Sequence, residues 1–359
     1  MTEPISDDWL SPPGDTIEDL LEERGWTKGE LAERLGRTPK YVSELVGGAA
    51  PISAETAAKL SRVLGSSPKF WLEREAHYRA ALERKKELTP SAEASSWLRD
   101  LPLKWLQAEG LVPSSAQGGQ LIQACLRYFG VADVSAWKRV YGKPMTAFRS
   151  SSTFKKCPGA VAAWLRRAEL SATDIRGGTW NANGFKAALV QLRPLTTEEE
   201  PTVFVEKLTE ACAKFGVAVV FVPAPPGCPV SGATRWLTPE KAMLALSLRH
   251  KSNDHLWFTF FHECGHLLRH GKKLEFIEGM DGLDRALEEE ANSFARDLLI
   301  PPSLAPELPS LRRSASVVEF AARAGVHPGI VVGRLQHDHH IGYQTLNGLK
   351  QRYVWAKSG

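Results

Sequence analysis

Short amphipathic helices dominate the hydrophobic pattern of the first quarter of the chain. Between residues 14 and 86, apolar residues recur at helical spacing, and Gly or Pro separates one run from the next. Thr27–Glu30 has the sequence of a capping box, which begins a helix that Gly36 ends. A further helix follows, with Thr38 as its cap and Pro39 in its first turn. The pattern predicts an all-helical domain over residues 14–86.

After this domain the pattern changes from uniformly helical to mixed. Residues 87–96 are small and polar, which is typical of a linker, and residues 97–199 are mostly helical and basic. Residues 200–313 contain both strand and helix patterns, and residues 314–341 predict two or three short helices. We therefore expect a multi-domain chain, mainly α with a small β-sheet, in which an all-α N-terminal domain precedes an α+β C-terminal domain.

Three strands and two long helices are expected in the C-terminal domain. The strands are short apolar runs at Val217–Val222, Gly232–Leu237 and Ala242–Leu248. We expect the last of them to lie at a sheet edge, where an extended substrate can pair with it. Helices are predicted from about residue 255 to 270 and from about residue 284 to 299.

The composition of the chain is that of a globular protein. Of its 359 residues, 43% are hydrophobic and 24% are charged, which excludes a disordered or fibrous chain. The five cysteines are scattered, so a disulfide framework is not expected. The N-terminus lacks the basic and apolar regions of a signal peptide, and the longest apolar runs are far too short to cross a bilayer. We expect a cytoplasmic protein with no membrane partner.

Charge is unevenly distributed along the chain. The total is +4, but residues 1–90 carry 13 Lys and Arg against 16 Asp and Glu, net −3, whereas residues 91–180 carry 12 against 6, net +6. Part of the basic excess lies among Phe and Trp residues in the segment 149–167. Such a region can contact nucleic acid, although basic runs are more often solvated faces.

The helix expected at residues 255–270 carries a stripe of histidines. At about 100° per residue, His255, His262, His266 and His270 fall within about 80° of one another, and aromatic residues and Leu occupy most of the remaining surface. A helix that is apolar on most sides is buried. The histidine stripe therefore needs a compensating partner.

Local signals mark the two ends of this helix. Asn253 or Asp254 is expected to cap its start, and Gly271 is expected to take the left-handed conformation after its last turn. Cys264 lies on the apolar side, where we expect it to pack and not to bind a metal.

His262 and His266 are one turn apart with Glu263 between them, in the pattern His-Glu-x-x-His. Two histidines at this spacing can bind one zinc ion, and the intervening Glu can act as general base on a bound water molecule. The pattern also arises by chance, but its place in a capped, buried helix favours a metal. His255 and His270 lie near the helix ends, where capping or a hydrogen bond to a ligand is more typical than ligation.

A third ligand is expected from the helix near residues 284–299. Its core stripe is predicted to be Leu287, Ala291, Phe294 and Leu298. Glu288 flanks the small, apolar side of that stripe and is the expected ligand, whereas Glu290 flanks the wetter side and is the reserve choice. Asn292, one turn after Glu288, can hydrogen-bond a ligand histidine. Alternatively, the glutamates only solvate the helix start and favour its dipole.

These motifs resemble those of the ImmA/IrrE metallopeptidases. The resemblance rests on His262–His266, Glu288–Asn292 and Leu298–Pro301, and it extends over about residues 200–341. It implies a gluzincin-like domain with one zinc ion per chain, held by the two histidines and the glutamate, with Glu263 as the catalytic residue. It also implies a protein substrate, such as a repressor or a toxin–antitoxin component.

The helices capped by Thr27 and Thr38 form a helix-turn-helix pattern, which places the start of its second helix in the major groove of DNA, although two-helix patterns recur in ordinary bundles. Residues 14–86 resemble the XRE-type, HigA-like domain. The resemblance implies that these residues face an operator in double-stranded DNA: Thr38, Pro39, Lys40, Tyr41, Ser43 and Glu44. Because a domain of net charge −3 attracts DNA weakly, we expect a homodimer, help from the basic residues of 97–180, or a partly protein-binding role.

Together these features predict a DNA-binding transcriptional regulator with a zinc-dependent endopeptidase domain that cuts a partner protein. A different class of function is a non-proteolytic, HigA-like antitoxin or repressor, whose metallopeptidase fold binds a partner or senses a signal. The presence of Glu263 favours the enzyme, because a purely structural zinc site has no need of that base.

Overall fold

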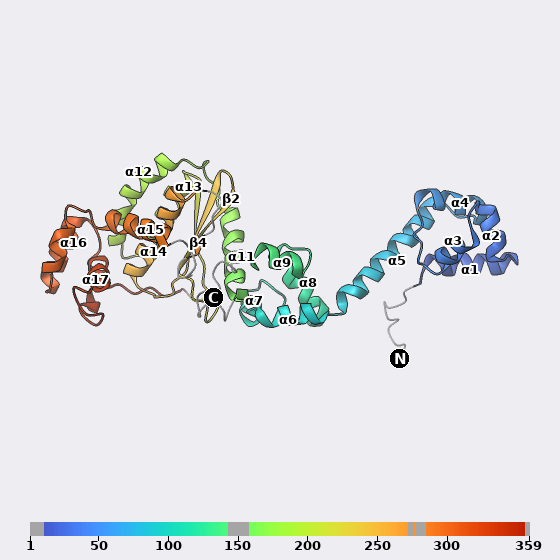
Figure 1. Cartoon of the computed structure of the whole chain (residues 1–359), viewed down its shortest axis with the longest axis horizontal. Helices are drawn as coiled ribbons and strands as arrows, with labels where there is room; N and C mark the ends of the chain where they lie inside the picture. Colours follow the sequence, from blue (N-terminus) through green and yellow to red (C-terminus); the bar gives the residue numbers. More distant parts are fainter. Residues whose placement is uncertain (1–10, 143–157, 272–275, 278–284, 356–359) are drawn as a thin grey trace. The chain divides into compact units, whose positions relative to one another are not determined.

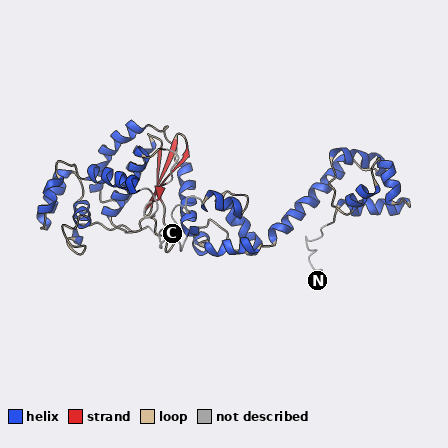
Figure 2. Cartoon of the chain, in the orientation of Figure 1, coloured by secondary structure: helices blue, strands red, loops and turns tan. Residues whose placement is uncertain are grey.

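The computed structural model describes residues 11–142, 158–271, 276–277 and 285–355 (Figure 1). The chain divides into two compact units, one containing residues 1–91 and 117–123 and the other containing the remaining residues. Helices make up most of both units, and the described strands belong to one sheet in the second unit (Figure 2).

The first unit is all-helical, as the sequence predicted. Its helices are α1 (Pro13–Arg24), α2 (Lys28–Leu35), α3 (Pro39–Val46), α4 (Ala54–Leu64) and α5 (Pro68–Leu88). Their apolar faces enclose one core, in which Ile17 and Trp71 are fully buried. α5 ends at Leu88 and the next helix begins at Ala92, so the interruption is shorter than the linker expected at residues 87–96.

The sequence signals around α2 and α3 have the expected conformations. Thr27 and Glu30 form a reciprocal capping box, with 3.2 Å between Glu30 N and Thr27 Oγ1. Gly36 ends α2 with φ +63°, a conformation that other residues adopt only with strain. Thr38 Oγ1 accepts a hydrogen bond from Tyr41 N at 3.2 Å and so caps α3. These two ends fix the tight turn between the helices.

Among the described residues, the next four helices after α5 are α6 (Ala92–Asp100), α7 (Leu103–Ala108), α8 (Gly118–Phe129) and α9 (Val134–Val140). The rings of Trp97, Phe129, Trp137 and Tyr141 form one cluster, with neighbouring centroids 5.2 to 6.1 Å apart. The cluster explains the high Trp content of this region as a packing requirement.

The sheet has four strands: β1 (Val217–Phe221), β2 (Gly232–Thr238), β3 (Lys241–Leu246) and β4 (Phe276–Ile277). Their order is β1-β3-β2-β4, with β1 parallel to β3 and the other pairs antiparallel. The three predicted strands are confirmed, and β4 was not foreseen. The expectation that Ala242–Leu248 lies at a sheet edge is wrong, because β3 is bonded on both sides and has no backbone groups left for a substrate.

Alternate residues of the strands enter different hydrophobic cores. Val217 and Val219 of β1 belong to one core, whereas Ala218 and Val220 belong to the other. α11 (Pro158–Asp174) covers the second of these faces (Figure 1). The remaining helices contribute to the first face: α12 (Ala182–Leu192), α13 (Pro201–Ala213), α14 (Asn253–Arg269), α15 (Arg285–Leu299), α16 (Ser314–Ala324) and α17 (Pro328–His337).

The sheet therefore shares its cores with segments outside the expected domain of residues 200–313. α11 and α12 come from the middle region, and α16 and α17 from the predicted C-terminal helices, of which two are confirmed. Three short 3₁₀ turns complete the described elements: η2 (Arg193–Thr197), η3 (Ala305–Ser310) and η4 (Asn347–Leu349).

The start of α14 is held by tertiary contacts and not by the predicted cap. Ser252 is the residue before the first turn and makes no side-chain cap, so the expectation that Asn253 or Asp254 caps the helix is wrong. Asn253 Oδ1 instead accepts from Gln351 N at 3.2 Å, and Asp254 pairs with Lys350. At the other end Gly271 has φ +73°, which confirms its left-handed conformation.

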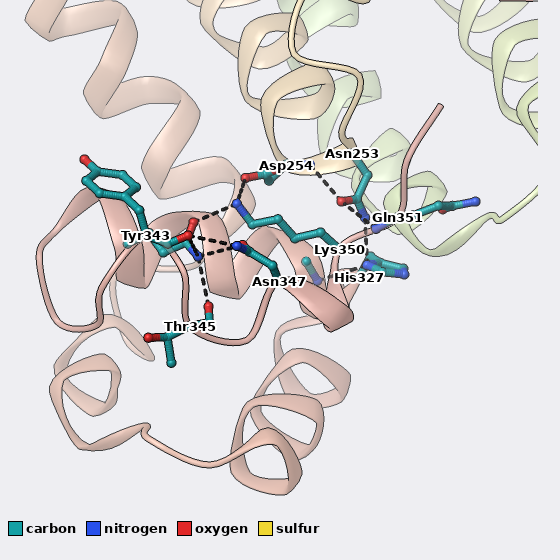
Figure 3. Close-up of polar contacts among 10 residues, drawn as sticks. Asn253, Asp254, His327, Tyr343, Thr345, Asn347, Lys350 and Gln351 are labelled. Atoms are coloured by element: carbon teal, nitrogen blue, oxygen red, sulfur yellow. Dashed lines mark hydrogen bonds and ion pairs between the residues drawn. The ribbon is translucent and has the colours of Figure 1, made fainter. Parts of the chain in front are cut away.

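The C-terminal segment is tied to α14 and α17 by a polar network (Figure 3). Lys350 Nζ lies 2.6 Å from Asp254 Oδ2 and 2.7 Å from Gln336 Oε1. Gln336 Nε2 donates to the carbonyl oxygens of Tyr343 and Thr345 at 3.3 and 3.0 Å. Because these groups are largely buried, the network fixes the path of the segment against α14.

Four cysteines fall in the described residues, and all are buried free thiols: Cys125, Cys212, Cys228 and Cys264. Cys157 lies outside the described residues. Cys264 is fully buried in the larger core, which confirms that it packs, and burial raises the pKa of its thiol. None of the described helices is long and apolar enough to cross a membrane.

Replacing Lys350 by Met should destabilise the second unit by about 3 kcal/mol, because it leaves the buried carboxylate of Asp254 without its cation. The double variant Asp254→Asn, Lys350→Met removes both charges and should lose clearly less. Urea unfolding followed by tryptophan fluorescence measures both. Equal losses in the single and double variants would mean that the ion pair contributes nothing.

Candidate functional site

The buried face of α14 presents two imidazoles to the same point. His262 and His266 are one turn apart and almost completely buried. Their Nε2 atoms lie 2.9 Å from each other. Glu263, between them, is fully buried as well. The predicted His-Glu-x-x-His pattern thus lies on a helix inside the domain, at the face that packs on α15.

α15 brings a carboxylate to these imidazoles. Glu288 Oε2 lies 3.5 Å from His262 Nε2, and Glu288 Oε1 lies 3.4 Å from His266 Nε2. One ligand atom from each of the three side chains lies within 4.8 Å of the others. Zinc bonds of about 2.0 to 2.2 Å in tetrahedral geometry place ligand atoms about 3.3 Å apart, so the arrangement fits a zinc ion with little adjustment.

Small residues allow α15 to approach α14 this closely. Gly265, inside the histidine pattern, lies against Ala291: a Cβ at position 265 would be 3.1 Å from Ala291 Cα. Ala291 and Ala295 are completely buried. The predicted core stripe is thus only partly correct. Leu287 and Leu298 are half-buried, and the closest packing is made by Ala291 and Ala295, on the side of the helix that also carries Glu288.

Glu290, the reserve ligand, lies elsewhere. Its side chain is 54% exposed, against 30% for Glu288, and its Oε2 atom is 3.2 Å from His270 Nε2. His270 Nδ1 is in turn 2.9 Å from His266 Nδ1. Sequence reasoning treated His270 and Glu290 separately and missed that they form one chain of contacts to His266. The spacing of four between the two histidines was the available signal.

These contacts favour one tautomer of His266. A carboxylate only accepts, so His270 donates from Nε2 to Glu290, which leaves Nδ1 of a neutral imidazole as the acceptor. His266 therefore donates from Nδ1 to His270 and keeps a lone pair on Nε2. The exposed glutamate thereby favours the tautomer of a buried imidazole that directs the Nε2 lone pair to Glu288.

Asn292 does the same for His262. Its Oδ1 atom lies 3.0 Å from His262 Nδ1, so that nitrogen donates and Nε2 keeps its lone pair. The sequence had placed Asn292 in contact with a ligand histidine. Two imidazole lone pairs and a carboxylate consequently converge on one point. These three electron-pair donors repel one another, and a divalent cation between them stabilises the arrangement.

Burial shifts the ionisation of all three groups. It lowers the pKa of His262 to about 4, against the opposing effect of Asn292, and lowers the pKa of His266 to about 2. Burial also raises the pKa of Glu288 to about 7. Both imidazoles are therefore neutral, as metal ligation requires. A cation at their Nε2 atoms would stabilise the charged form of the carboxylate.

Glu263 is held beside the first residue of β2. A Cβ at Gly232 would lie 2.5 Å from Thr259 Cγ2 and 3.1 Å from Glu263 Oε1. The absence of a side chain at position 232 thus lets the strand pass directly over the acid. His255, expected in a capping role or in contact with a ligand, is instead exposed and stacks on His250, with ring centroids 4.2 Å apart.

The candidate DNA-facing residues lie at the exposed start of α3. Thr38, Pro39, Lys40, Ser43 and Glu44 are exposed. Some of their polar groups are already engaged, since Thr38 caps the helix and Ser43 Oγ donates to Pro39 O at 3.0 Å.

Tyr41 is half-buried and anchored. Its hydroxyl is 2.9 Å from Thr56 Oγ1, and the Arg37 guanidinium lies over its ring, 5.4 Å from the centroid. Lys40 is the one described cation among the six candidates and is 84% exposed.

The basic aromatic segment 149–167 is only partly within the described residues. Phe148, Arg149, Phe154, Lys155 and Lys156 lie outside them. The described part has structural contacts: Trp164 is fully buried and donates from Nε1 to Val222 O at 2.9 Å. Arg166 pairs with Glu169 at 3.0 Å. Trp164 thus packs in the core, whereas Arg166 is partly buried and paired, so neither side chain is simply solvated.

Comparison with known proteins assigns families to two parts of the chain. Residues 17–71 match the family model described as Helix-turn-helix, and residues 212–336 match the model described as the IrrE N-terminal-like domain. The chain therefore has an XRE-type helix-turn-helix domain at its N-terminus and an IrrE/ImmA-like domain at its C-terminus. Both resemblances inferred from the sequence are confirmed.

A similarity to one curated protein concerns a shorter part of the chain. The uncharacterised HTH-type transcriptional regulator YddM of Escherichia coli (strain K12) is 42% identical over 60 residues. The match covers 17% of this chain and 64% of that protein, somewhat less than two thirds of its length.

The close approach at Gly232 can be tested by substitution. Gly232→Ala should destabilise the second unit by about 1 to 3 kcal/mol, because the new methyl group must displace Thr259 and Glu263. Gly348→Ala is the matched control, since a Cβ there meets no atom within 4 Å. Thermal unfolding compares the two. An unchanged midpoint in Gly232→Ala would contradict the packing of β2 on the acid.

Proposed function

We propose that this protein is a transcriptional regulator that binds DNA through its helix-turn-helix domain and hydrolyses a peptide bond of a partner protein at a zinc centre. The observation that supports the enzyme most directly is the convergence of His262 Nε2, His266 Nε2 and the Glu288 carboxylate. Burying three such electron-pair donors against one another is costly, and a divalent cation removes that cost. Asn292 and His270 favour the same outcome by fixing both tautomers.

Zinc at this point would act as a Lewis acid, lowering the pKa of water and polarising a carbonyl group. We assign Glu263 as the general base that takes the proton of the attacking water and returns it to the leaving amine. Its full burial places it in the low-dielectric region where the imidazoles are neutral. A structural zinc site would not need such an acid, so Glu263 supports catalysis over simple binding.

The DNA-binding arm is assigned to α3, with its first turn in the major groove. The exposed Thr38, Pro39, Lys40, Ser43 and Glu44 face the operator in this proposal, and the anchored ring of Tyr41 positions them. The relative named as an HTH-type transcriptional regulator supports the assignment. Because the first 90 residues carry net charge −3, a single domain attracts phosphates weakly, and we propose that a homodimer binds the operator.

The substrate that we propose is a second regulatory protein, such as a repressor or a component of a toxin–antitoxin pair. A chain that contains both a DNA-reading and a peptide-cutting domain brings the cutting activity to proteins assembled at the operator. Cleavage of such a protein would change transcription, and the change would last until new protein is synthesised.

The metal centre predicts about one zinc ion per purified chain. Mass-spectrometric metal analysis should find it lost in His262→Ala and in Glu288→Gln, and retained in Glu263→Gln. Glu289→Gln is the matched control for a change at α15, because Glu289 is 61% exposed and pairs with Arg296 instead of facing the histidines.

Loss of the general base should slow cleavage by about 10²-fold or more. To obtain a substrate, proteins that co-purify with the Glu263→Gln chain are isolated. Wild-type chain is then added to them, and the rate at which each protein is cleaved is compared with the rate for the Glu263→Gln chain. Promoter regulation in vivo that is identical in Glu263→Gln and wild type would favour the non-proteolytic antitoxin or repressor function.

The DNA arm is tested with two lysines in matched settings. Lys40 is 84% exposed and 3.8 Å from Glu44, and Lys69 on α5 is 82% exposed and 3.7 Å from Glu73. Lys40→Ala should weaken operator binding in a gel shift by about 5-fold or more and reduce its salt dependence, because a phosphate contact is lost. Lys69→Ala should have no such effect. Equal behaviour of the two variants would remove α3 from the DNA interface.

A further inference from the structure

A cavity of about 220 Å³ lies between three helices and the C-terminal segment of the second unit. Its apolar walls come from Phe258 of α14, from Leu299 and Ile300 at the end of α15, and from Ile330 of α17. None of the proposed zinc ligands lines it, so it is a site distinct from the metal centre. Since an engineered cavity of about 150 Å³ in another protein binds benzene, this one has room for a ring with a short chain.

The Lys and Arg side chains that line the cavity are already neutralised. Each has a carboxylate partner, and the three pairs are Arg296–Glu289, Arg334–Asp338 and Lys350–Asp254. A charged ligand would have to break one of these pairs or remain unpaired among apolar side chains, and both cost free energy. The charge balance therefore favours a neutral ligand.

Asp254 offers one hydrogen-bond acceptor at this wall. The residue is 7% exposed, and its Oδ2 atom lies 2.6 Å from Lys350 Nζ. Its Oδ1 atom is buried, and no described group donates a hydrogen bond to it. A buried acceptor without a donor is costly, and a carboxylate accepts a strong, charge-assisted bond from a hydroxyl group. A ligand hydroxyl at this atom would thus add both affinity and orientation.

Tyr343 marks the opening of the cavity. It lines the wall and yet is 63% exposed, and its ring points away from the polar network that holds the C-terminal segment (Figure 3). Its backbone oxygen accepts from Gln336 Nε2 at 3.3 Å, so the backbone is held while the exposed ring can change rotamer. A small molecule can therefore enter without release of the segment.

We infer that this cavity binds a neutral, hydroxylated apolar small molecule, with its apolar body among the three helices and its hydroxyl group on Asp254 Oδ1. The inference does not depend on the proposed peptidase function. Because the ligand would contact α14, α17, the end of α15 and the C-terminal segment at once, its binding stabilises the folded second unit by mass action.

Four probes with one carbon skeleton test the inference on the full-length wild-type chain, by isothermal titration calorimetry. The alcohol 3-phenylpropan-1-ol should bind with a Kd of about 1 mM or below, and it should raise the thermal unfolding midpoint. Its methyl ether lacks the O–H donor, 3-phenylpropanoate is an anion and 3-phenylpropylamine is a cation. Each of these three should bind about 10-fold more weakly or worse.

Cavity-filling variants locate the site. Ile330→Trp and Leu299→Trp introduce a ring from different helices, and each should weaken binding of the alcohol by about 10-fold or more. Val318→Trp is the matched control, because Val318 on α16 is 44% exposed and does not line the cavity. Thermal unfolding without ligand checks that each variant folds, and the four probes need only the wild-type chain.

Different results would overturn the inference in different ways. No heat from the alcohol up to about 10 mM would mean that the cavity binds no such molecule. Equal affinity for the alcohol and its methyl ether would remove Asp254 as the acceptor. Tighter binding of the carboxylate or the amine would assign the cavity to a charged ligand. Unchanged affinity in a folded cavity-filling variant would place the bound alcohol elsewhere on the protein.

Discussion

The close approach of α14 to α15 is the constraint on which the candidate site depends. Gly265 packs against Ala291 without an intervening side chain, and this contact brings Glu288 within 3.5 Å of both imidazoles. A Cβ at position 265 would lie 3.1 Å from Ala291 Cα, so a larger residue there would push the helices apart and move Glu288 relative to the imidazoles. The glycine within the histidine pattern therefore matters for helix packing as much as the histidines do for chemistry.

Around this contact the domain supplies an outer set of hydrogen bonds at both ends of the site. Asn292 and the His270–Glu290 pair each hold an Nδ1 atom, so both Nε2 lone pairs are directed inward before any ligand arrives. Burial keeps the imidazoles neutral. Pre-organisation of this kind lowers the cost of binding a cation, because no ring has to rotate or lose a proton.

The start of α14 couples this site to the C-terminal segment. Asp254 and Lys350 form a buried pair two turns before His262, and the same segment lines a cavity between α14, the end of α15 and α17. The helix that carries the histidines is thus held by a segment almost one hundred residues away in the sequence. This explains why the core extends beyond the expected peptidase region, to α17 on one side and to α11 and α12 on the other.

The sequence by itself determined the elements and the ligand types, because both depend on local spacing. Caps at Thr27 and Thr38, the short apolar run of β1, and histidines one turn apart on an apolar helix are visible within a few residues. Only tertiary structure decided that β3 is an inner strand, that Ser252 and not Asn253 precedes α14, and that Glu290 reaches His270. Each of these depends on which distant backbone lies alongside, and periodicity along one segment carries no information about its neighbours in space.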